Sequence, residues 1–436
     1  MIEEIFRELY KAPVEFRWAL ANSGLQKIMT GEAWDVSPFG RRGRLIRRLV
    51  GFAGVFGCVR IVVAVVAASE VIRLMYLARR FPPVVLPESC CIFVGFGAGP
   101  EEQMWHAFAE DSGDAAIRLD ATKPETFLAY HRPSTWELFK QTWRSSAAVV
   151  PFLSKTKLEP VASNREDTLT FAALRMGEYI LHRTWWEEIE QASISQVVFI
   201  SADFRAFACI DANIAPVEYH QHGLHRKSIL MPSFPVLKML TQVEADWYRQ
   251  YLPQSEIEVL RPQQRVVGHR PCILIASIYE VPRFYKNQDL ARMQSLLLWA
   301  NQNNLEVVIR KHPRETDHFW QTHFPELEID KSQGRFEDAL MRIKPMFVVS
   351  WFSTSLVDAL LANVVAVSIM QATDSRITDL IFEIPKHCLL WPIAEPAMNA
   401  LVNGQTDVDS VVSDLQEARS DHSEHAALAG VKQIEL

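Results

Sequence analysis

Short apolar runs rich in valine and isoleucine recur along the chain from residue 90 onward, and each run ends at polar residues or glycine. Runs of this length are typical of parallel strands that are covered on both faces of their sheet. We expect strands at 90–94, 116–119, 197–200, 215–219, 238–243, 257–260, 272–276, 307–309 and 347–349. Helical stretches separate most of these runs, and this alternation predicts an α/β fold of doubly wound parallel sheets.

Prolines and polar linkers divide the chain into four regions. Residues 1–84 are expected to be helical up to a break at Phe81-Pro82-Pro83. Residues 85–265 and 266–400 each hold enough strands for one Rossmann-like domain, and residues 401–436 are expected to be a polar, frayed tail. A length of 436 residues agrees with two domains and an appendage, because single hydrophobic cores rarely grow so large.

The region between residues 122 and 190 is expected to be helical and is rich in tryptophan. We interpret its tryptophans as core residues, and a platform that stacks on sugar rings is the alternative. They are Trp136, Trp143, Trp185 and Trp186.

A cluster of arginines precedes the apolar run Leu49–Ala68, which Arg60 alone interrupts. The cluster consists of Arg41, Arg42, Arg44, Arg47 and Arg48. The run is long enough to span a bilayer, but a spanning helix would hold Arg60 near the bilayer centre, which is costly. We therefore expect a helix that is buried or lies on the inner-membrane surface, and a purely structural helical hairpin is the alternative. A secretory signal peptide would begin near residue 1, so none is expected.

Composition and charge narrow the class of protein. Hydrophobic residues make up 49% and charged residues 22% of the chain, as in globular proteins. The six cysteines lack the CxxC spacing of metal sites, so we expect buried free thiols in the reducing cytoplasm. The net charge of −7 argues against nucleic acid as a partner. Residues 1–84 nevertheless carry +6, from 13 basic and 7 acidic residues, which leaves −13 for the remainder.

Two strand ends in the second domain combine basic and hydroxyl side chains. One strand is followed by Arg310, Lys311, His312 and Pro313, and another by Ser353, Thr354 and Ser355 at the start of a helix. Open α/β sheets bind ligands at the carboxyl ends of their strands, and helix starts suit phosphate. We expect a site for a phosphorylated ligand here, with Ser277 at a third strand end. A helix cap and an ordinary strand end are the structural alternatives.

The first domain offers candidates for acid–base chemistry. Asp203 follows one strand, and another strand leads into His220, Gln221, His222 and Gly223. Side chains alternate along a strand, so His220 and His222 point to one face and Gln221 to the other. Histidine is suited to acid–base work at neutral pH, and no ligand spacing indicates a metal site. A structural role for both histidines is the alternative.

These strand ends resemble the motifs of a known group of enzymes. Two doubly wound domains that face a cleft, with the nucleotide site in the second, are the layout of GT-B glycosyltransferases. His312-Pro313 resembles the HP motif of bacterial sialyltransferases, polysialyltransferases and related capsule enzymes, and Ser353–Ser355 is similar to their serine/threonine motif. In that group these residues hold the CMP part of a CMP-activated sugar. Related Kdo transferases of capsule and lipopolysaccharide assembly also use such a donor.

One motif departs from the pattern of that group. Where those enzymes carry an acidic pair before glycine, this chain has Gln221-His222-Gly223. This form looks more like the HG motif of teichoic-acid and capsule polymerases that use CDP-linked donors. The resemblance as a whole covers residues 195–370, and each motif is two or three residues long.

The resemblance implies a cytoplasmic, membrane-peripheral glycosyltransferase that moves a CMP-activated 2-keto sugar acid, Kdo or sialic acid, to a surface-polysaccharide or lipid-linked acceptor. His312 and Lys311 would meet the charge that grows on the leaving phosphate. His222 or Asp203 would activate the acceptor hydroxyl, and Asp203 or Glu280 would be the nucleophile if configuration is retained.

The nucleotide sugar is a donor substrate in this interpretation, and neither a metal nor a cofactor is expected. A CDP-polyol phosphotransferase of the teichoic-acid type is one alternative. A non-catalytic scaffold in a polysaccharide assembly complex is another. The sequence leaves open the sugar, the acceptor, the stereochemistry and the oligomeric state.

Overall fold

The computed structural model divides into two compact units, and each is described by itself. Strands β1 to β6 belong to the first unit and β7 to β12 to the second. The described residues are 10, 40–55, 57–80, 82–95, 100–113, 115–121, 123–155, 165–189, 194–214, 216–221, 230–240, 242–259, 265–277, 288–312, 315–316, 318–332, 336–351, 353–369 and 388–417.

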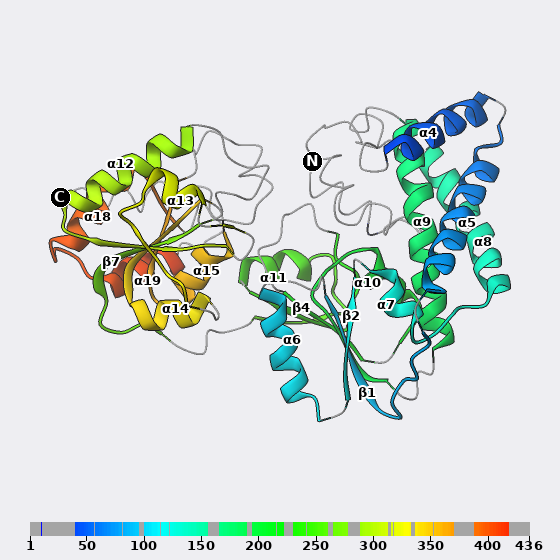
Figure 1. Cartoon of the computed structure of the whole chain (residues 1–436), viewed down its shortest axis with the longest axis horizontal. Coiled ribbons are helices and arrows are strands. Elements are labelled where there is room, and N and C mark those ends of the chain that lie inside the picture. Colours follow the sequence, from blue (N-terminus) through cyan, green and yellow to red (C-terminus); the bar gives the residue numbers. More distant parts are fainter. Residues whose placement is uncertain are drawn as a thin grey trace. The chain divides into compact units, whose positions relative to one another are not determined.

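The first unit is built on a sheet with the strand order β2-β1-β3-β4-β5-β6 (Figure 1). Its strands are β1 (Cys90–Gly95), β2 (Ala115–Asp120), β3 (Ile194–Phe199), β4 (Val217–His220), β5 (Val236–Met239) and β6 (Glu256–Val259). The pairs from β2 through β5 are parallel, as the apolar runs predict. β5 begins two residues before the run expected at 238–243. The chain reverses direction across the sheet between β1 and β3, which is its topological switch point.

Helices accompany this sheet and also form a bundle beside it. The bundle consists of α4 (Gly40–Val55), α5 (Val59–Ala78), α8 (Thr135–Lys155) and α9 (Arg165–Glu188). The other helices of the unit are α6 (Pro100–Asp111), α7 (Pro124–Leu128), α10 (Phe204–Asp211) and α11 (Gln242–Arg249). α9 packs against α4, α5 and α8 and also against α10, so it joins the bundle to the rest of the unit (Figure 1).

The apolar run at 49–68 is divided between two helices, which corrects the single helix expected there. Gly57 separates α4 from α5 with a φ of 69°, a left-handed conformation that glycine adopts at little cost. α4 and α5 pack against each other as a hairpin and against α9. No helix in the described part of the chain has both the length and the apolar character that crossing a bilayer requires.

The tryptophans of the helical region fall into two groups. Trp185 and Trp186 are buried as expected, with ring centroids 4.7 Å apart. Trp136 and Trp143 are 72% and 47% exposed, so the core interpretation is wrong for these two. The reason is the orientation of α8, which buries the opposite side of the helix, including Leu138.

The second unit contains a parallel sheet with the order β12-β11-β10-β7-β8-β9. Its strands are β7 (Arg270–Ala276), β8 (Glu306–Arg310), β9 (Glu328–Ile329), β10 (Pro345–Ser350), β11 (Val365–Ser368) and β12 (Leu389–Leu390). From β7 the chain adds β8 and β9 toward one edge of the sheet, and it then returns to add β10, β11 and β12 toward the other edge. The switch point therefore lies between β7 and β10. The expectation of two doubly wound α/β sheets is confirmed.

The helices of the second unit are α12 (Gln288–Gln302), α13 (His318–His323), α14 (Phe336–Ile343), α15 (Thr354–Leu361), α18 (Glu395–Val402) and α19 (Val408–Glu417). α19 lies in the region expected to be a frayed tail, yet its Val408, Val411 and Val412 join the second hydrophobic core. Asn304 and Asn363 close α12 and α15 with φ of 54° and 65°, a conformation that asparagine tolerates.

All six cysteines are free thiols, as expected, and five of them are buried. Burial raises the pKa of Cys272 to about 12, and the nearby Glu306 acts in the same direction. Burial also raises the pKa of Cys209 well above its ordinary value. Such thiols remain protonated at neutral pH and behave as small apolar side chains.

Candidate functional site

Three strand ends of the second sheet meet at one edge. β7 lies between β10 and β8, and all three strands are parallel. Ala276 pairs in register with Arg310, and the amide of Ser277 donates a hydrogen bond to the Arg310 carbonyl at 2.8 Å. On the other side, the Ser350 hydroxyl donates to the Ala276 carbonyl at 2.7 Å. The residues expected to bind a phosphorylated ligand thus flank the switch point.

The serine–threonine segment begins α15, as the sequence predicts. Ser353 is the N-cap, and its hydroxyl accepts a hydrogen bond from the Ser355 amide at 3.3 Å. The two hydroxyls lie 2.5 Å apart, and Ser355 is buried. Thr354 is the first residue of α15, and its side chain lies outside the described set. Ser353 therefore caps the helix, as the structural alternative expected. A helix start has about four free amide donors and one cap uses only one of them, so the same helix start can also bind an anion.

The turn after β8 is closed by Glu315, an acidic residue that lies outside the sequence motifs. The Glu315 carboxylate accepts a hydrogen bond from the His312 amide at 3.0 Å, and the Glu315 amide donates to the His312 carbonyl at 2.8 Å. Glu315 is buried, whereas Lys311 and His312 are half-buried. The backbone of His312 is therefore held from both sides, which limits where its ring can lie.

The side chain of Arg310 is engaged away from this turn. Its guanidinium pairs with Asp330 at 2.8 Å and donates to the Ser332 hydroxyl at 2.9 Å. Arg342 pairs with the same carboxylate at 2.8 Å. Burial raises the pKa of Asp330, but hydrogen bonds from Ser332 and the two guanidinium groups outweigh it, and the pKa is lowered. A phosphate contact by Arg310 would have to share its guanidinium with Asp330.

Ser277 connects the end of β7 to α13. Ser277 is 2% exposed, and its hydroxyl accepts a hydrogen bond from the indole N–H of Trp320 at 2.9 Å. Trp320 is itself fully buried in α13. This contact gives Ser277 a structural role, and its predicted contact with ligand stays a prediction.

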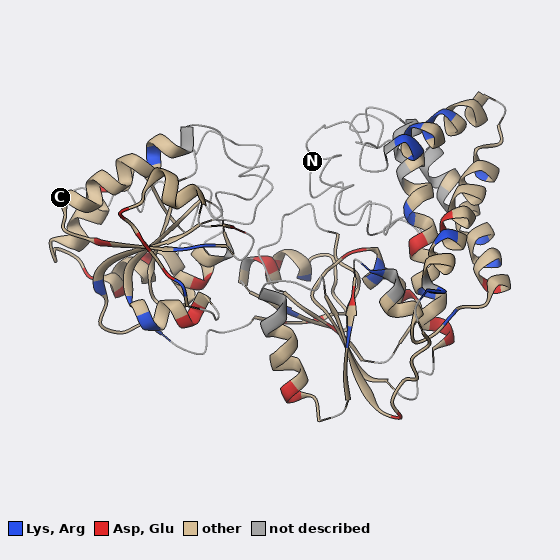
Figure 2. Ribbon diagram, in the orientation of Figure 1, with Lys and Arg blue, Asp and Glu red and all other residues tan. Residues whose placement is uncertain are grey.

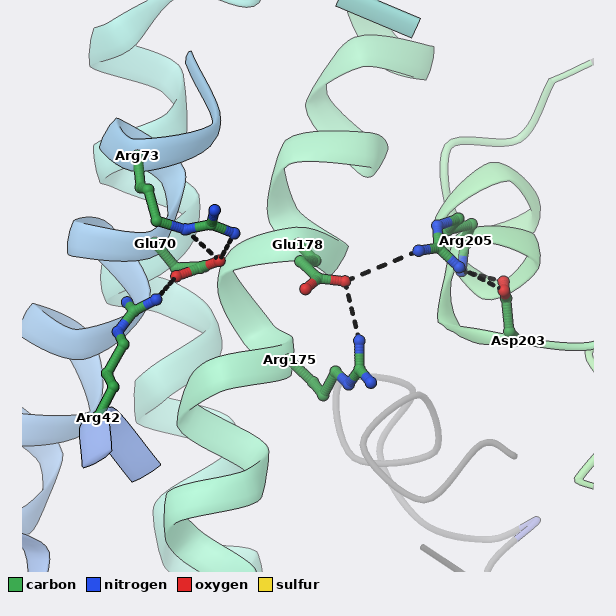
Figure 3. A network of polar contacts seen from close by, with 7 residues as sticks. All are labelled: Arg42, Glu70, Arg73, Arg175, Glu178, Asp203 and Arg205. Carbon is green, nitrogen blue, oxygen red and sulfur yellow. Dashed lines mark hydrogen bonds and ion pairs between the residues drawn. The ribbon is translucent and has the colours of Figure 1, made fainter. Parts of the chain in front are cut away.

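Asp203, at the carboxyl end of β3, belongs to a buried charge network (Figure 3). It caps α10 by accepting from the Arg205 amide at 2.9 Å, and it pairs with the Arg205 guanidinium at 2.6 Å. Glu178 lies 3.9 Å from Arg205 and 3.1 Å from Arg175. Asp203 is 2% exposed, so this network stabilises a charge that would otherwise be costly to bury.

A second polar cluster lies on β4 and its neighbours. Glu218 pairs with His220 and with Lys238, both at 2.9 Å, and accepts from Gln196 at 2.9 Å. Burial raises the pKa of Glu218, but these hydrogen bonds lower it to about 2. Burial lowers the pKa of His220 despite this carboxylate. Gln221 is buried on the opposite face of the strand, in agreement with the predicted alternation.

Several predicted site residues are outside the part that the structure describes. They are His222, Glu280 and Pro313, and their roles stay predictions. Within the described residues, no group of three or more His, Cys, Asp or Glu side chains could hold a metal ion. Sequence reasoning missed Glu315, which has no periodic signal and is recognisable only from its hydrogen bonds to the turn.

Comparisons with known proteins give only distant likenesses. No protein-family model and no curated protein matches the sequence. Among solved structures, the wall teichoic acid polymerase TagF is 9% identical, with 80% of this chain and 91% of that chain covered and a TM-score of 0.39. MurG of Acinetobacter baumannii is 10% identical, with 79% and 99% covered and a TM-score of 0.38.

The UDP-GlcNAc 2-epimerase of Methanocaldococcus jannaschii gives similar values, with 10% identity, 79% and 99% covered and a TM-score of 0.38. Likenesses of this size carry no conclusion about activity. What the chain does has to be inferred from its own residues.

Proposed function

We propose that this chain is a GT-B-type glycosyltransferase that moves a CMP-activated 2-keto sugar acid, Kdo or sialic acid, to a surface-polysaccharide or lipid-linked acceptor. We place it at the inner-membrane surface as a peripheral protein. One observation supports this most: the half-buried Lys311 and His312 and the start of α15 flank the switch point of the second sheet.

The spacing of these groups fits a nucleotide. β8 and β10 lie on either side of β7, and neighbouring strands are about 4.8 Å apart, so their ends are separated by about 10 Å. A nucleoside monophosphate that lies over the end of β7 would reach both. Its phosphate would meet cationic side chains on one side and helix amides on the other.

The proposed chemistry is mainly electrostatic. As the bond from the sugar to the phosphate of CMP breaks, negative charge grows on the phosphate, and Lys311, His312 and the α15 dipole would stabilise it. His222 is the preferred candidate for the base that activates the acceptor hydroxyl. The reason is that Asp203 is already engaged as a cap and as the partner of Arg205. For a retaining reaction, Glu280 then becomes the preferred nucleophile.

A CDP-polyol phosphotransferase is the second candidate. The observation that favours it is Gln221, which is a buried, uncharged residue where the sialyltransferase pattern has an acid. Both candidates use a cytidine nucleotide, so they predict the same site in the second unit and differ in the group that is transferred.

Calorimetry with CMP, CDP, UDP and GDP tests the proposal, with two variants of Ser353. Ser353→Asp keeps a good N-cap but adds a negative charge beside the proposed phosphate site. It should retain the wild-type unfolding free energy within about 0.5 kcal/mol, because the cap is kept. It should bind CMP at least about tenfold more weakly, which corresponds to about 1.4 kcal/mol, because the new carboxylate repels the phosphate. Ser353→Ala should lose about 1 kcal/mol of stability with a smaller effect on affinity.

Preference for CMP, together with the loss in Ser353→Asp, would support the CMP-sugar transferase. Turnover of a CDP-linked polyol would favour the second candidate. Absence of binding to all four nucleotides would contradict both and leave a non-catalytic scaffold as the remaining interpretation.

A further inference from the structure

Three helices of the bundle carry apolar stripes that face outward. On each helix the exposed apolar residues recur at spacings of three, four or seven positions, so they lie on one side of that helix. Their exposed fractions range from 45% to 81%. The residues are Leu45, Leu49, Phe52 and Val55 on α4, Ile61, Val65, Ile72 and Tyr76 on α5, and Trp136, Phe139 and Trp143 on α8. Exposed apolar groups gathered on neighbouring elements mark interaction sites.

The opposite sides of the same helices are buried in the interior of the bundle. Val50 on α4, Val63 and Ala67 on α5 and Leu138 on α8 are buried. α4 packs on α5, α5 packs on α8, and all three pack on α9. The guanidinium of Arg60 lies 4.6 Å from the ring centre of Trp143, which links the exposed sides of α5 and α8. The stripes therefore form the outer surface of one packed assembly.

This outer surface is strongly basic. Residues 40–80 contain nine arginines and one acidic residue, Glu70. Glu70 is buried and pairs with Arg42 and Arg73, so the one carboxylate of this segment is turned inward. Figure 2 shows basic positions along α4 and α5. The exposed arginines are Arg41, Arg44, Arg48, Arg73, Arg79 and Arg80.

We infer that this surface docks onto an anionic lipid bilayer, with the apolar stripes in the headgroup region and the arginines at lipid phosphates. Tryptophans, aliphatic side chains and arginines match that interface, and α4 and α5 expose no acidic side chain. A second copy of the chain is a poor occupant, because a symmetric interface would bring the arginines of both copies together. The inference deepens the membrane location of the proposed function and does not depend on the donor site.

Co-sedimentation with vesicles tests the inference, using phosphatidylcholine with and without phosphatidylglycerol. The wild type should bind the anionic vesicles. Changing Arg41, Arg44 and Arg48 to Gln should weaken this binding on the order of a hundredfold, because each arginine near the surface is attracted to the anionic lipid. Changing Ile61 and Val65 to Ser should also weaken it, by about tenfold or more, through loss of apolar contact with the lipid.

Matched changes in the second unit serve as controls. One control variant changes three exposed basic residues to Gln and so removes as much charge as the arginine variant: Arg265, Arg270 and Lys331. The other changes two exposed apolar residues to Ser: Leu298 and Ile393. Both control variants should bind like the wild type. An unchanged urea unfolding transition in every variant would show that the first unit is still folded.

Equal loss in control and test variants, or equal binding to neutral and anionic vesicles, would overturn the inference. A change of oligomeric state in the Ile61 and Val65 variant without a change in vesicle binding would mean that a second copy covers this surface instead. Vesicle binding by a protein that binds no nucleotide would leave the docking surface standing and contradict only the proposed function.

Discussion

His312 is the residue whose replacement tests the donor site most directly. Its backbone is held by Glu315, and its half-buried ring lies at a strand end, not in a core. We expect His312→Ala to lose about 2–4 kcal/mol of transition-state stabilisation in kcat/KM, the scale of one preorganised donor. The fold should survive, with a similar unfolding free energy in urea. His318→Ala, at an exposed histidine of α13, is the matched control, and wild-type turnover by His312→Ala would remove His312 from the site.

The Glu218 cluster makes a prediction about pH. The pKa of Glu218 is lowered from 4.5 to about 2 in the folded chain, so the unfolded chain takes up its proton first as the pH falls. The stabilisation is complete above pH 4.5 and disappears as the pH falls toward 2. Urea unfolding should show that Glu218→Gln costs about 1–2 kcal/mol at pH 7 and much less at pH 3, the value being reduced because Lys238 is partly solvated.

Glu256→Gln, at an exposed position of β6, controls for the loss of one carboxylate and should show no such dependence. A pH-independent cost for Glu218→Gln would mean that shape and not charge explains the contribution of Glu218.

The sequence predicted where single polar residues lie along the strands, but it did not predict which side chains they pair with. Asp203 is recognisable as a polar residue after an apolar strand, yet only the structure shows that Arg205 turns back to pair with it. Trp136 and Trp143 show the same limit for apolar residues. α8 carries apolar residues on two of its sides. Both sides have the same helical spacing, so the sequence does not indicate which of them faces the core.

At the level of elements, the crossing of α5 and α9 depends on a glycine. A Cβ atom at Gly177 would lie 2.7 Å from the Ala67 carbonyl oxygen and 2.7 Å from the Glu70 Cβ, closer than real contacts. We expect Gly177→Ala to destabilise the first unit by about 1–3 kcal/mol, because the two helices must separate. Chemical denaturation followed by circular dichroism measures this.

Gly54→Ala in α4 is the matched control, since a Cβ there meets nothing within 4 Å. Alanine should raise stability there by about 0.5–1 kcal/mol, because it favours the helix. A neutral or stabilising Gly177→Ala would show that α5 and α9 adjust more easily than their backbone contact indicates.

The long buried strands were the most predictable elements and the shortest the least. β7 and β10 contain continuous apolar runs that are typical of covered parallel strands. β9 and β12 are two residues long, and nothing in so short a stretch distinguishes a strand from a loop. α19 was missed because residues 401–436 are polar overall, although Val408, Val411 and Val412 have the spacing of one helix face.

At the level of the whole molecule, the two units should respond differently to nucleotide. A ligand that binds only the folded second unit should slow hydrogen exchange there and leave the first unit unchanged. With CMP at about a hundred times its dissociation constant, we expect about a hundredfold slower exchange around 311–316 and 353–356, where local opening must release the ligand. Mass spectrometry of peptic fragments measures this. Protection confined to the first unit would contradict the assignment of the donor site.

The organisation into two sheets follows from the repeated alternation of strands and helices, but the bundle does not. α4 and α5 come from the start of the chain, whereas α8 and α9 are inserted between β2 and β3. Their association is a contact between segments distant in sequence, and no local pattern specifies it. The sequence therefore predicted these helices without predicting that they pack together.

The glycine contact between α5 and α9 also has a mechanical consequence. At Gly177 the backbone of α9 lies against the Ala67 carbonyl and the Glu70 side chain of α5, so a shift of α5 toward α9 would push α9 with it. The next residue on α9 is Glu178, which faces Arg205, and Arg205 holds the cap at the end of β3 (Figure 3). A load applied to the outer face of α5 would thus travel as a rigid displacement to the strand end that holds Asp203.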